Sequence, residues 1–529
     1  MIRVTGILLA ILAAALLLSR GPFVGTGAND QGPHRTGAQE APRLRIIATN
    51  DFHGALAPTQ TSSGRKRGGA GAMAAAIERA QRECPVPCVT LLVDGGDMFQ
   101  GTAESNLAHG RPVVELYNAL GYAAAAVGNH EFDWGLDTLR ARMGEAHFSM
   151  LGANVRYRDG RDVPWIPDDT IVERGPYRIG IIGVIGPETY TSTLAANVAT
   201  LRFARPEPIV DSMTRALRGR GADVVVVLAH SGAFCKQKGT RACDGSIIDL
   251  AHGLRERVDA IVSGHTHSVV DFAVGGVPVV QASSSGRAVA VVDLAPRSGG
   301  EGRSDELLAE EVESVASDAR PSAEIEAIIR RADEKVAALA KRRVATLATS
   351  LPRRGVDYPL GNLIADAERW AGQADVALVN NGGIRAGLRA GAVTYGELVQ
   401  VQPFGNPLRR LSVRGAALRA YLERLLESKG PRAHVSGMVI RYDTERRSGS
   451  RIVSATMADG TPLRGEATYS LVLNEYMATG SAGRILERDA TGSELLGPSD
   501  IDALVAYLES RPQPVKAPVG RRFTSIGKR

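Results

Sequence analysis

The chain has 529 residues, which is enough for two large domains or about three of average size. Hydrophobic residues make up 44% of the chain, charged residues 23% and aromatic residues 5%, and this balance excludes collagen-like, fully disordered and multi-span membrane proteins. The 63 basic and 57 acidic residues give a formal net charge of +6, which is too slight at this length to indicate a nucleic-acid-binding protein. We therefore expect a globular protein with no nucleic acid as a partner.

Residues 1–28 have the layout of a secretory signal peptide. Arg3 supplies the positive start, an apolar run from Ile7 to Leu18 follows, and small residues come next, beginning at Gly25. The apolar run is shorter than the about 20 residues that a transmembrane helix needs, and an uncleaved membrane anchor is the alternative. We predict a periplasmic or extracellular protein with no stable membrane span after signal cleavage.

The four cysteines form two local pairs, Cys84/Cys88 and Cys235/Cys243. An exported protein can form disulfides, and local bridges are the simplest of the three possible connectivities. A zinc site at Cys84 and Cys88 is the alternative, but the two prolines between these cysteines favour a bridged turn.

From residue 43 onward, apolar runs of strand length alternate with stretches of helical character. The runs consist largely of Val, Ile and Leu, which is typical of strands buried on both faces. This pattern predicts an α/β layered domain over residues 43–298, with some antiparallel or mixed pairing. The expected strands are Leu44–Thr49, Val89–Val93, Ala123–Val127, Arg178–Val184, Asp223–Ala229, Asp259–Ser263, Val277–Gln281 and Val289–Leu294.

The composition changes near residue 296, and we expect residues 299–343 to form a linker and a connecting helix. The stretch Glu301–Asp318 carries seven acids and one base, and we interpret it as a solvated helix face. Apolar residues at helical spacing between Ser322 and Arg343 predict the connecting helix. A second domain is expected over residues 344–525, with helices at Leu360–Gly372 and Ala416–Ser428 and strands at Val376–Val379, Met438–Tyr442, Arg451–Met457 and Tyr469–Leu473.

Five of the expected strands in the first domain end in a polar cluster. In α/β sheets, ligands bind outside the carboxyl ends of the strands, so these clusters are expected to converge. Mixed imidazole and carboxylate ligands suit Zn, Mn or Fe, and two such ions about 3.5–4 Å apart can clamp a phosphoryl group. Each cluster alone could be a capping Asp or a surface His, but their joint occurrence predicts a metal site. The clusters are Asn50-Asp51-Phe52-His53-Gly54, Asp94-Gly95-Gly96-Asp97, Gly128-Asn129-His130-Glu131-Phe132-Asp133, His230, and Gly264-His265-Thr266-His267.

This order of motifs resembles the calcineurin-like metallophosphoesterases. More closely, it resembles the two-domain 5′-nucleotidase and UDP-sugar hydrolase family, over nearly all of residues 43–525. The resemblance implies an α/β fold, in which a four-layer metallophosphoesterase β-sandwich flanked by helices is followed by a smaller C-terminal α+β domain that binds the substrate. It also implies two divalent metal ions, Zn, Mn or similar. One would be held by Asp51, His53, Asp97 and His267, and the other by Asp97, Asn129, His230 and His265, with Asp97 as the bridge.

His130 and Asp133 match the catalytic dyad of this family. A histidine beside the metals can donate to the phosphoryl oxygen or the leaving group, and a carboxylate three residues on can orient and charge it. The resemblance implies a secreted enzyme that releases phosphate from nucleotides, and possible further substrates are UDP-sugars or other phosphate esters. A metal-bound hydroxide would attack phosphorus, and the ions and His130 would stabilise the transition state.

Several motifs of the second domain match the substrate-binding segments of the family. Arg354-x-x-Asp357-x-x-Leu360-Gly361-Asn362 and Asn380-Asn381-Gly382-Gly383-Ile384-Arg385 resemble two of its loops, and they suggest that Arg354, Asn380 and Arg385 bind the substrate. Phe404 and Tyr476 lie in segments that resemble those carrying the two aromatics that hold the base. Ala482 stands where relatives have an Asp that binds the ribose hydroxyls, so hydrolysis is better supported than nucleoside selectivity.

Two other interpretations compete with the nucleotidase. A thiosulfohydrolase-type relative would share the two-domain plan and the metal site, and a secreted binding protein would use the same scaffold without turnover. A nuclease acting on polymers is disfavoured, because we find no basic stripe with interleaved aromatics. The expected partner is a small nucleotide or phosphate ester, and the oligomeric state is not predicted.

Overall fold

The computed structural model describes residues 42–60, 66–235, 243–297, 301–311, 321–480 and 483–526. The predicted signal peptide and the departure from the family pattern at Ala482 lie outside the described residues.

Two six-stranded sheets make up the first part of the fold. In the first sheet, β1, β4, β5 and β6 are parallel neighbours, and β17 pairs antiparallel with β1. In the second sheet, parallel strands occupy the centre, and β8 and β15 are antiparallel edges. The first sheet has the order β18 (Glu301–Glu311), β17 (Ala288–Arg297), β1 (Arg43–Thr49), β4 (Cys88–Asp94), β5 (Ala124–Ala126) and β6 (Ser149–Leu151). The second has the order β15 (Val269–Val274), β16 (Val277–Ala282), β14 (Ala260–Ser263), β11 (Val224–His230), β9 (Tyr177–Ile185) and β8 (Asp169–Arg174).

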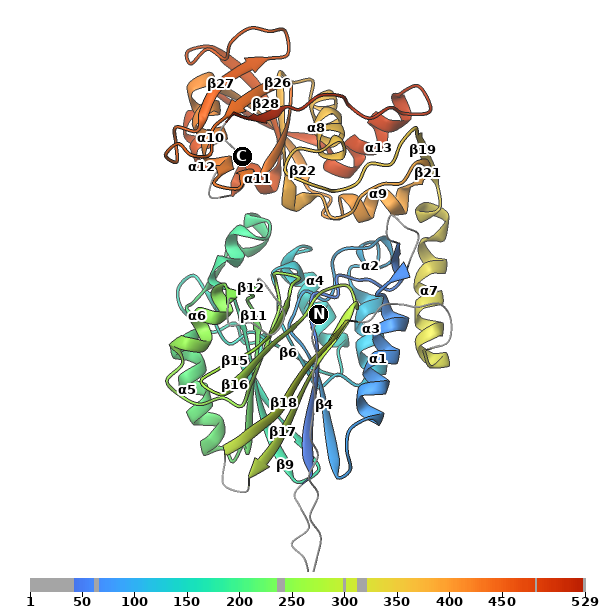
Figure 1. Ribbon diagram of the computed structural model, residues 1–529, viewed down its shortest axis with the longest axis vertical. Coiled ribbons are helices and arrows are strands. Elements are labelled where there is room, and N and C mark those ends of the chain that lie inside the picture. Colours follow the sequence, from blue (N-terminus) through green and yellow to red (C-terminus); the bar gives the residue numbers. More distant parts are fainter. Residues whose placement is uncertain are drawn as a thin grey trace, which may run out of the picture. The chain divides into compact units, whose positions relative to one another are not determined.

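These sheets pack face to face between two layers of helices, as Figure 1 shows. Side chains such as Ile46 and Val226 fill the space between the sheets, while their strand neighbours Ile47 and Val225 face the helices. The helices on the first sheet are α1 (Ala70–Arg82), α3 (Arg111–Leu120) and α4 (Leu136–Glu145), and α7 (Ala323–Ala340) packs outside them against α1 and α3. The helices on the second sheet are α5 (Pro206–Gly219) and α6 (Ser246–Gly253). The predicted four-layer arrangement is confirmed.

The segment after residue 300 differs from the prediction. The acidic stretch 301–311 forms strand β18, paired antiparallel with β17, so its interpretation as a solvated helix face is wrong. The expected connecting helix is α7, but it is not solvated all round. It buries Ile325 and Ile328 in the core of the first part, and Val336 in the core of the second. The expected domain boundaries around residues 299–343 stay predictions.

The second part of the fold is built on a five-stranded sheet. Alternate residues of strand β20 (Val376–Asn380) belong to different cores. Val379 lies in the core that includes residues of α8, α9 and α13, and Leu378 lies in the core that includes residues of α10, α11 and α12. The order is β25 (Ala433–Ser436), β20 (Val376–Asn380), β28 (Thr468–Asn474), β22 (Pro407–Arg414) and β29 (Gly492–Ser499), and a three-stranded sheet joins β27 (Ile452–Met457), β26 (Met438–Tyr442) and β30 (Phe523–Ser525). The helices are α8 (Pro359–Ala371), α9 (Tyr395–Val401), α10 (Gly415–Leu425), α11 (Glu475–Thr479), α12 (Arg484–Asp489) and α13 (Asp500–Ser510).

Short elements complete the described chain. Helix α2 (Ala103–Asn106) follows the loop after β4, and β7 (Val155–Tyr157) pairs with β10 (Leu201–Phe203). Other two-stranded pairs are β2 (Thr59–Gln60) with β3 (Lys66–Arg67), β12 (Phe234–Cys235) with β13 (Cys243–Asp244), β19 (Arg343–Leu347) with β21 (Gly391–Thr394), and β23 (Leu426–Glu427) with β24 (Gly430–Pro431).

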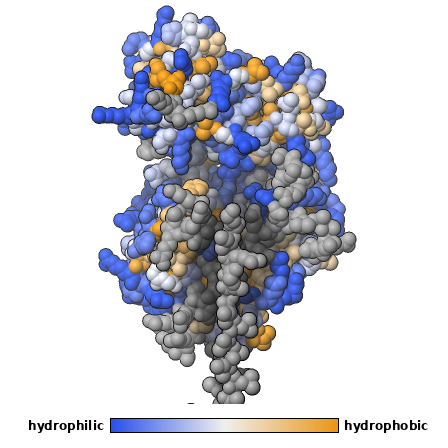
Figure 2. Space-filling view, in the orientation of Figure 1, coloured by the Kyte–Doolittle hydropathy of each residue, from blue (hydrophilic) through white to orange (hydrophobic). Residues whose placement is uncertain are grey.

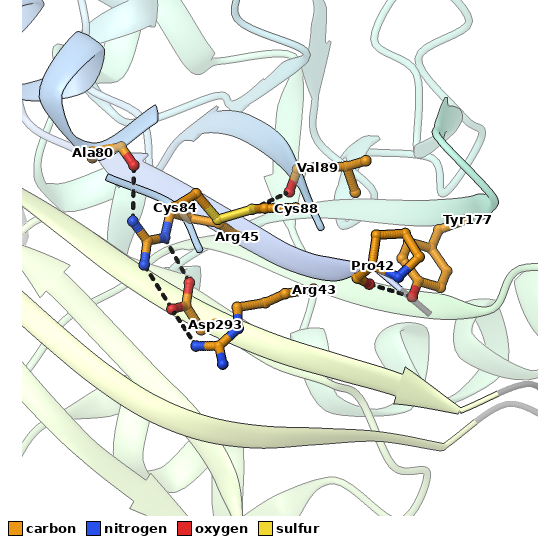
Figure 3. Close-up of a disulfide and its surroundings, with 9 residues drawn as sticks. All are labelled: Pro42, Arg43, Arg45, Ala80, Cys84, Cys88, Val89, Tyr177 and Asp293. Atoms are coloured by element: carbon orange, nitrogen blue, oxygen red, sulfur yellow. Dashed lines mark hydrogen bonds and ion pairs between the residues drawn. A yellow bond between two sulfur atoms is a disulfide. The ribbon is translucent and has the colours of Figure 1, made fainter. Parts of the chain in front are cut away.

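Both local cysteine pairs are disulfides, Cys84–Cys88 (Figure 3) and Cys235–Cys243. The predicted connectivity is confirmed, and the zinc alternative at Cys84 and Cys88 is excluded because these sulfurs are bonded to each other.

Among the described residues, no helix is long and apolar enough to cross a membrane. On the face drawn in Figure 2, apolar side chains lie singly or in small groups among hydrophilic ones.

A buried ion pair joins β1 to β17 beside the first disulfide (Figure 3). Arg45 donates to both carboxylate oxygens of Asp293, from Nε and Nη2 at 2.7 Å each, and Nη1 donates to the backbone oxygen of Ala80 at 2.9 Å. Arg43 adds a third bond to Asp293 at 3.1 Å. Burial alone would raise the pKa of Asp293, but the hydrogen bonds from the two arginines outweigh it and lower the pKa below 3.8.

We expect Asp293→Asn to lower the free energy of unfolding by about 3–5 kcal/mol, because it removes the negative charge that accepts two hydrogen bonds from the buried Arg45. Glu145→Gln, which breaks the exposed pair with Arg111, is the control and should cost less than about 1 kcal/mol. Urea unfolding at pH 7 measures both. Because folding lowers the pKa of Asp293, its carboxylate contributes to the free energy of unfolding above the unfolded-state pKa and loses this contribution as the pH falls. The difference in stability between wild type and Asp293→Asn should therefore shrink below about pH 4. Equal destabilisation by the two variants would contradict this assignment.

Candidate metal centre and active site

The predicted metal ligands lie at the carboxyl ends of five strands, three in the first sheet and two in the second. Asp51 follows β1, Asp97 follows β4, and Asn129 follows β5. His230 is the last residue of β11, and His265 follows β14. Because parallel strands end at the same edge of a sheet, polar residues far apart in the sequence come together here.

The first cluster consists of Asp51, His53 and His267. The Oδ1 atom of Asp51 lies 3.8 Å from Nε2 of His53 and 3.4 Å from Nε2 of His267. His53 Nδ1 donates to the backbone oxygen of Gln100 at 2.8 Å, which leaves its Nε2 lone pair directed at the cluster. Three potential ligand atoms therefore converge on one point.

The second cluster consists of Asp97, His230 and His265, with Asn129 beside them. The Oδ2 atom of Asp97 lies 3.0 Å from His230 Nε2, and Asn129 Oδ1 lies 3.1 Å from His230 Nε2 and 3.0 Å from His265 Nδ1. His230 Nδ1 donates to Gly95 at 2.9 Å, and the amide nitrogen of Asn129 donates to Ser192 at 3.0 Å. These two bonds orient the imidazole and the amide so that their free atoms face the cluster.

Asp97 lies between the two clusters. Its Oδ1 atom accepts the backbone N–H of His130 at 2.9 Å, while Oδ2 is 3.9 Å from His53 Nε2 and 3.0 Å from His230 Nε2. In each cluster the ligand atoms lie within 4.8 Å of one another. Imidazole and carboxylate donors at these separations suit divalent cations such as Zn or Mn. The side chains present therefore fit a metal centre.

The backbone at this centre is strained. Five of the seven predicted ligands have left-handed φ values between 49° and 79°, namely Asp51, His53, Asp97, His265 and His267. Such a conformation costs a non-glycine residue about 1–3 kcal/mol and persists where the surrounding structure imposes it, often at functional sites. Here these residues lie within four residues of the ends of β1, β4 and β14, where the chain turns away from the sheets. The centre is also tightly packed at Gly128, because a Cβ atom at this position would collide with the Asp97 carboxylate.

Burial sets the charge of these groups. It lowers the pKa of His53 to about 3 and that of His265 to about 4, so both are neutral at pH 7, the form that binds metal. Burial raises the pKa of Asp51 to about 7. Burial would also raise the pKa of Asp97, but His230 and His130 outweigh it and hold the pKa well below 3.8. Two buried carboxylates side by side are stabilised by a bound cation.

His130 and Asp133 form a hydrogen-bonded pair. His130 Nδ1 lies 2.6 Å from Asp133 Oδ2, and Thr193 donates to the other carboxylate oxygen at 2.9 Å. Burial would lower the pKa of His130, but Asp133 and Asp97 outweigh it and raise the pKa above 6.5. The pair thus favours the protonated form of the ring, whose Nε2 lies 3.9 Å from Asp97 Oδ2.

Glu131 is a buried residue whose role the sequence analysis missed. Its Oε2 atom accepts the N–H groups of Asp97 and Gly128 at 2.9 and 2.7 Å, and Oε1 accepts that of Met98 at 2.8 Å. Burial raises its pKa to about 8. Asn50 acts similarly, since it donates to Asp51 at 2.6 Å and accepts the N–H of Ala282 at 2.6 Å. Both residues lie inside the polar clusters at the strand ends, and this position is the sequence feature by which they could have been found.

A cavity of about 170 Å³ adjoins the metal-ligand cluster. Of the residues predicted from the second domain, Asn380, Arg385, Phe404 and Tyr476 all line it. The Phe404 ring stacks on the His130 ring at a centroid distance of 5.3 Å and an angle of 26°, and the guanidinium of Arg385 lies 5.8 Å from the Phe404 centroid. Tyr476 donates from its hydroxyl to the backbone oxygen of Thr191 at 2.8 Å.

Arg354 is not brought to this site. It is exposed and does not line this cavity, whereas its neighbour Arg353 lines a larger groove of about 790 Å³ beside the centre. Asp357, in the same motif, has a structural role, because it accepts the N–H groups of Arg522 and Phe523 at 2.9 and 3.2 Å and so anchors the C-terminal segment.

Comparison with known proteins agrees with this geometry. Residues 44–269 match the calcineurin-like phosphoesterases, and residues 336–488 match the 5′-nucleotidase C-terminal domain. The endonuclease YhcR of Bacillus subtilis is 30% identical over 91% of the chain, and the chain spans 41% of that protein's length. The snake venom 5′-nucleotidase of Gloydius brevicauda is 28% identical over 92% of the chain and 89% of its own length.

Among solved structures, the 5′-nucleotidase precursor of Thermus thermophilus superposes with a TM-score of 0.78 at 28% identity, over 91% of this chain and 99% of that one. This chain carries the calcineurin-like phosphoesterase domain followed by the 5′-nucleotidase C-terminal domain, together with the metal-ligand clusters. The chain therefore belongs to the two-domain 5′-nucleotidase family of metal-dependent phosphoric ester hydrolases.

Proposed function

We propose that this chain is a secreted hydrolase that holds two divalent metal ions and releases phosphate from nucleotides. One observation carries the proposal: metal-ligand side chains, the His130–Asp133 pair, Arg385 and two aromatic side chains line the same cavity. A nucleotide needs this combination, because its phosphate, its leaving oxygen and its base require different groups. The snake venom and Thermus relatives are named 5′-nucleotidases, which supports nucleotides as substrates.

The ligand residues divide between two ions. Asp51, His53 and His267 would hold one ion, Asn129, His230 and His265 the other, and Asp97 both, since its Oδ2 atom faces histidines of both clusters. Divalent ions held there supply Lewis-acid chemistry, which polarises the phosphoryl oxygens and favours the ionisation of water.

The remaining residues act on the organic part of the substrate. His130 donates the proton from Nε2 to the oxygen that leaves phosphorus, and Asp133 keeps the ring oriented and charged for this step. Arg385 donates to the phosphoryl oxygens, and its guanidinium is 3.3 Å from His267 Nε2, at the edge of the centre. Phe404 and Tyr476 contact the base.

An oxidising compartment is also part of the proposal. Both cysteine pairs are disulfides, which persist in the periplasm or outside the cell and are rare in the cytosol. The start of the chain, residues 1–28, would direct export.

A phosphate-release assay on AMP, UDP-glucose and other phosphate esters with added Mn²⁺ tests the function. Release from nucleotides supports the proposal. No release from any phosphate ester would contradict it and favour the thiosulfohydrolase-type or binding-protein alternative.

We expect His130→Ala to lower kcat for AMP by about 10²–10⁴-fold, because the leaving oxygen loses its proton donor. Asp133→Asn keeps the His130 ring in place but removes the carboxylate charge beside it, so the decrease in kcat should be smaller than in His130→Ala. His147→Ala is the control, since His147 is exposed and outside the cavity, and it should leave kcat within about twofold. An unchanged kcat in His130→Ala would exclude this role of His130.

We expect purified protein loaded with Mn²⁺ to hold two ions per chain, and Asp97→Asn to hold fewer, because an amide is a poor bridge between two cations. Metal analysis after desalting measures this, and circular dichroism checks that the variant is folded. Asp137→Asn, at an exposed acid of α4, is the matched control. Full metal content in Asp97→Asn would contradict the bridging assignment.

A further inference from the structure

Phe404 lies in a short segment between helix α9 and strand β22, residues 402–406, which we call the Phe404 segment. This segment is neither helix nor strand, and Gly405 within it has a left-handed φ of 59°. Contacts from more regular parts of the fold must therefore hold Phe404 where a base could stack on it.

Three printed contacts hold the backbone of the Phe404 segment. At its end, Asp500 of α13 accepts the side-chain amide of Asn406 on Oδ2 at 3.2 Å, and the backbone N–H of Asp500 donates to the backbone oxygen of Asn406 at 2.9 Å. In its middle, Asn106 of α2 donates to the backbone oxygen of Pro403 at 2.6 Å. The side chain of Gln402, at its start, is the polar group that these contacts leave out.

Glu368 of α8 is the buried acid beside Gln402. Glu368 is 0% exposed, and neither of its carboxylate oxygens has a hydrogen-bond partner among the described residues. Gln402 is 2% exposed, and its Oε1 atom is likewise unpaired within the described part of the chain. If Glu368 were ionised, these neighbouring oxygens would all be acceptors without a donor, which is rare for buried polar groups.

A proton on Glu368 removes this conflict. A protonated carboxyl group has one O–H donor, and Gln402 Oε1 is an unpaired acceptor beside it. Burial and the charge of Asp500 both raise the pKa of Glu368 well above 4.5, which favours the neutral form. Burial also raises the pKa of Asp500 to about 7. Two buried acids are thus packed behind the Phe404 segment, one at each end of it.

We propose that Glu368 and Asp500 are positioning residues for Phe404, and that Glu368 does this as a neutral acid that donates to Gln402 Oε1. Asp500 completes the support by accepting from Asn406 at the other end of the segment. The inference rests on the proposed nucleotidase function, in which Phe404 contacts the base. Neither acid is among the residues that line the cavity, so both act through the Phe404 segment.

Loss of this support should weaken binding of the nucleotide more than it slows the chemical step. Phe404 stacks on the ring of His130, but Asp133 holds that ring independently through the bond to Nδ1. The metal ligands are held by the loops of the first domain. The effect is therefore expected in KM for AMP and not in kcat.

The test measures KM and kcat for AMP, and the inhibition constant of inorganic phosphate, on the full-length protein with Mn²⁺. Glu368→Leu removes the donor and leaves Gln402 Oε1 unpaired, so KM for AMP should rise about tenfold. The values of kcat and of the phosphate inhibition constant should stay within about twofold, because phosphate does not contact Phe404. Asp500→Ala frees the other end of the segment and should raise KM in the same way.

The conservative variant distinguishes a neutral acid from a charged one. Glu368→Gln supplies an amide donor of similar size that cannot ionise, so KM should stay within about twofold of wild type. Infrared difference spectroscopy between wild type and Glu368→Gln measures the proton directly, and wild type at pH 7 should show the additional carbonyl band of a carboxylic acid. Absence of this band, or a KM in Glu368→Gln as high as in Glu368→Leu, would overturn the assignment of the proton.

Glu423→Gln is the matched control. Glu423 is another buried acid of the second domain, but it accepts the backbone N–H groups of Arg451 and Ile452 at 2.7 and 2.8 Å. Its substitution should lower stability in urea unfolding without changing KM. An unchanged KM in both Glu368→Leu and Asp500→Ala would overturn this inference and leave the nucleotidase in place, whereas no turnover of any phosphate ester would contradict the proposed function itself.

Discussion

The position of the Asp97 carboxylate is the constraint on which the centre depends. One of its oxygens is fixed by the backbone N–H of His130, and this leaves the other to face imidazoles of both clusters. Glu131 helps to fix the carboxylate in this position, because it ties the two loops together. A single oxygen of Glu131 accepts N–H groups from Asp97, after β4, and from Gly128, after β5. The positions of Asp97 and Asn129 are therefore set by the adjacent parallel strands β4 and β5 and by the buried Glu131.

Collecting acids and imidazoles in a buried site opposes folding. The left-handed backbone at five ligands adds strain, and the raised pKa of Asp51 shows that its charge is poorly solvated. The β-sandwich offsets this cost elsewhere, because both sheets bury apolar side chains on both faces. Divalent cations would relieve much of the remaining repulsion. The scaffold therefore favours metal binding, since His53, His230 and Asn129 are already oriented by backbone carbonyls outside the clusters.

The sequence predicted the strands and the ligand clusters because both follow local rules. Continuous Val and Ile runs mark buried parallel strands, and polar residues directly after such runs meet at one sheet edge. Features that depend on tertiary pairing were missed. The acid-rich sequence of Glu301–Glu311 does not distinguish a helix from a strand, and only backbone pairing with β17 selects the strand. The motif around Arg354 was recognised, but the neighbour Arg353 is the residue that lines the groove, because loop geometry decides which side chain faces inward. The function of Glu131 was also hidden, since backbone N–H groups leave no mark in a sequence.

Arg385 lines both the cavity beside the metal-ligand cluster and the larger groove next to it. This position bears on how the enzyme would choose substrates. Its guanidinium lies beside His267 on one side and over the Phe404 ring on the other. Burial and the nearby Arg353 both disfavour its charge and lower its pKa, so a bound anion gains more from neutralising it than from an exposed arginine. An anion held by Arg385 would therefore border both the cavity and the groove. The smaller cavity has aromatic side chains at Phe404 and Tyr476, whereas the groove is larger and has cationic side chains at Arg287 and Arg353. The walls on the two sides therefore offer different chemistry to groups attached to one bound anion.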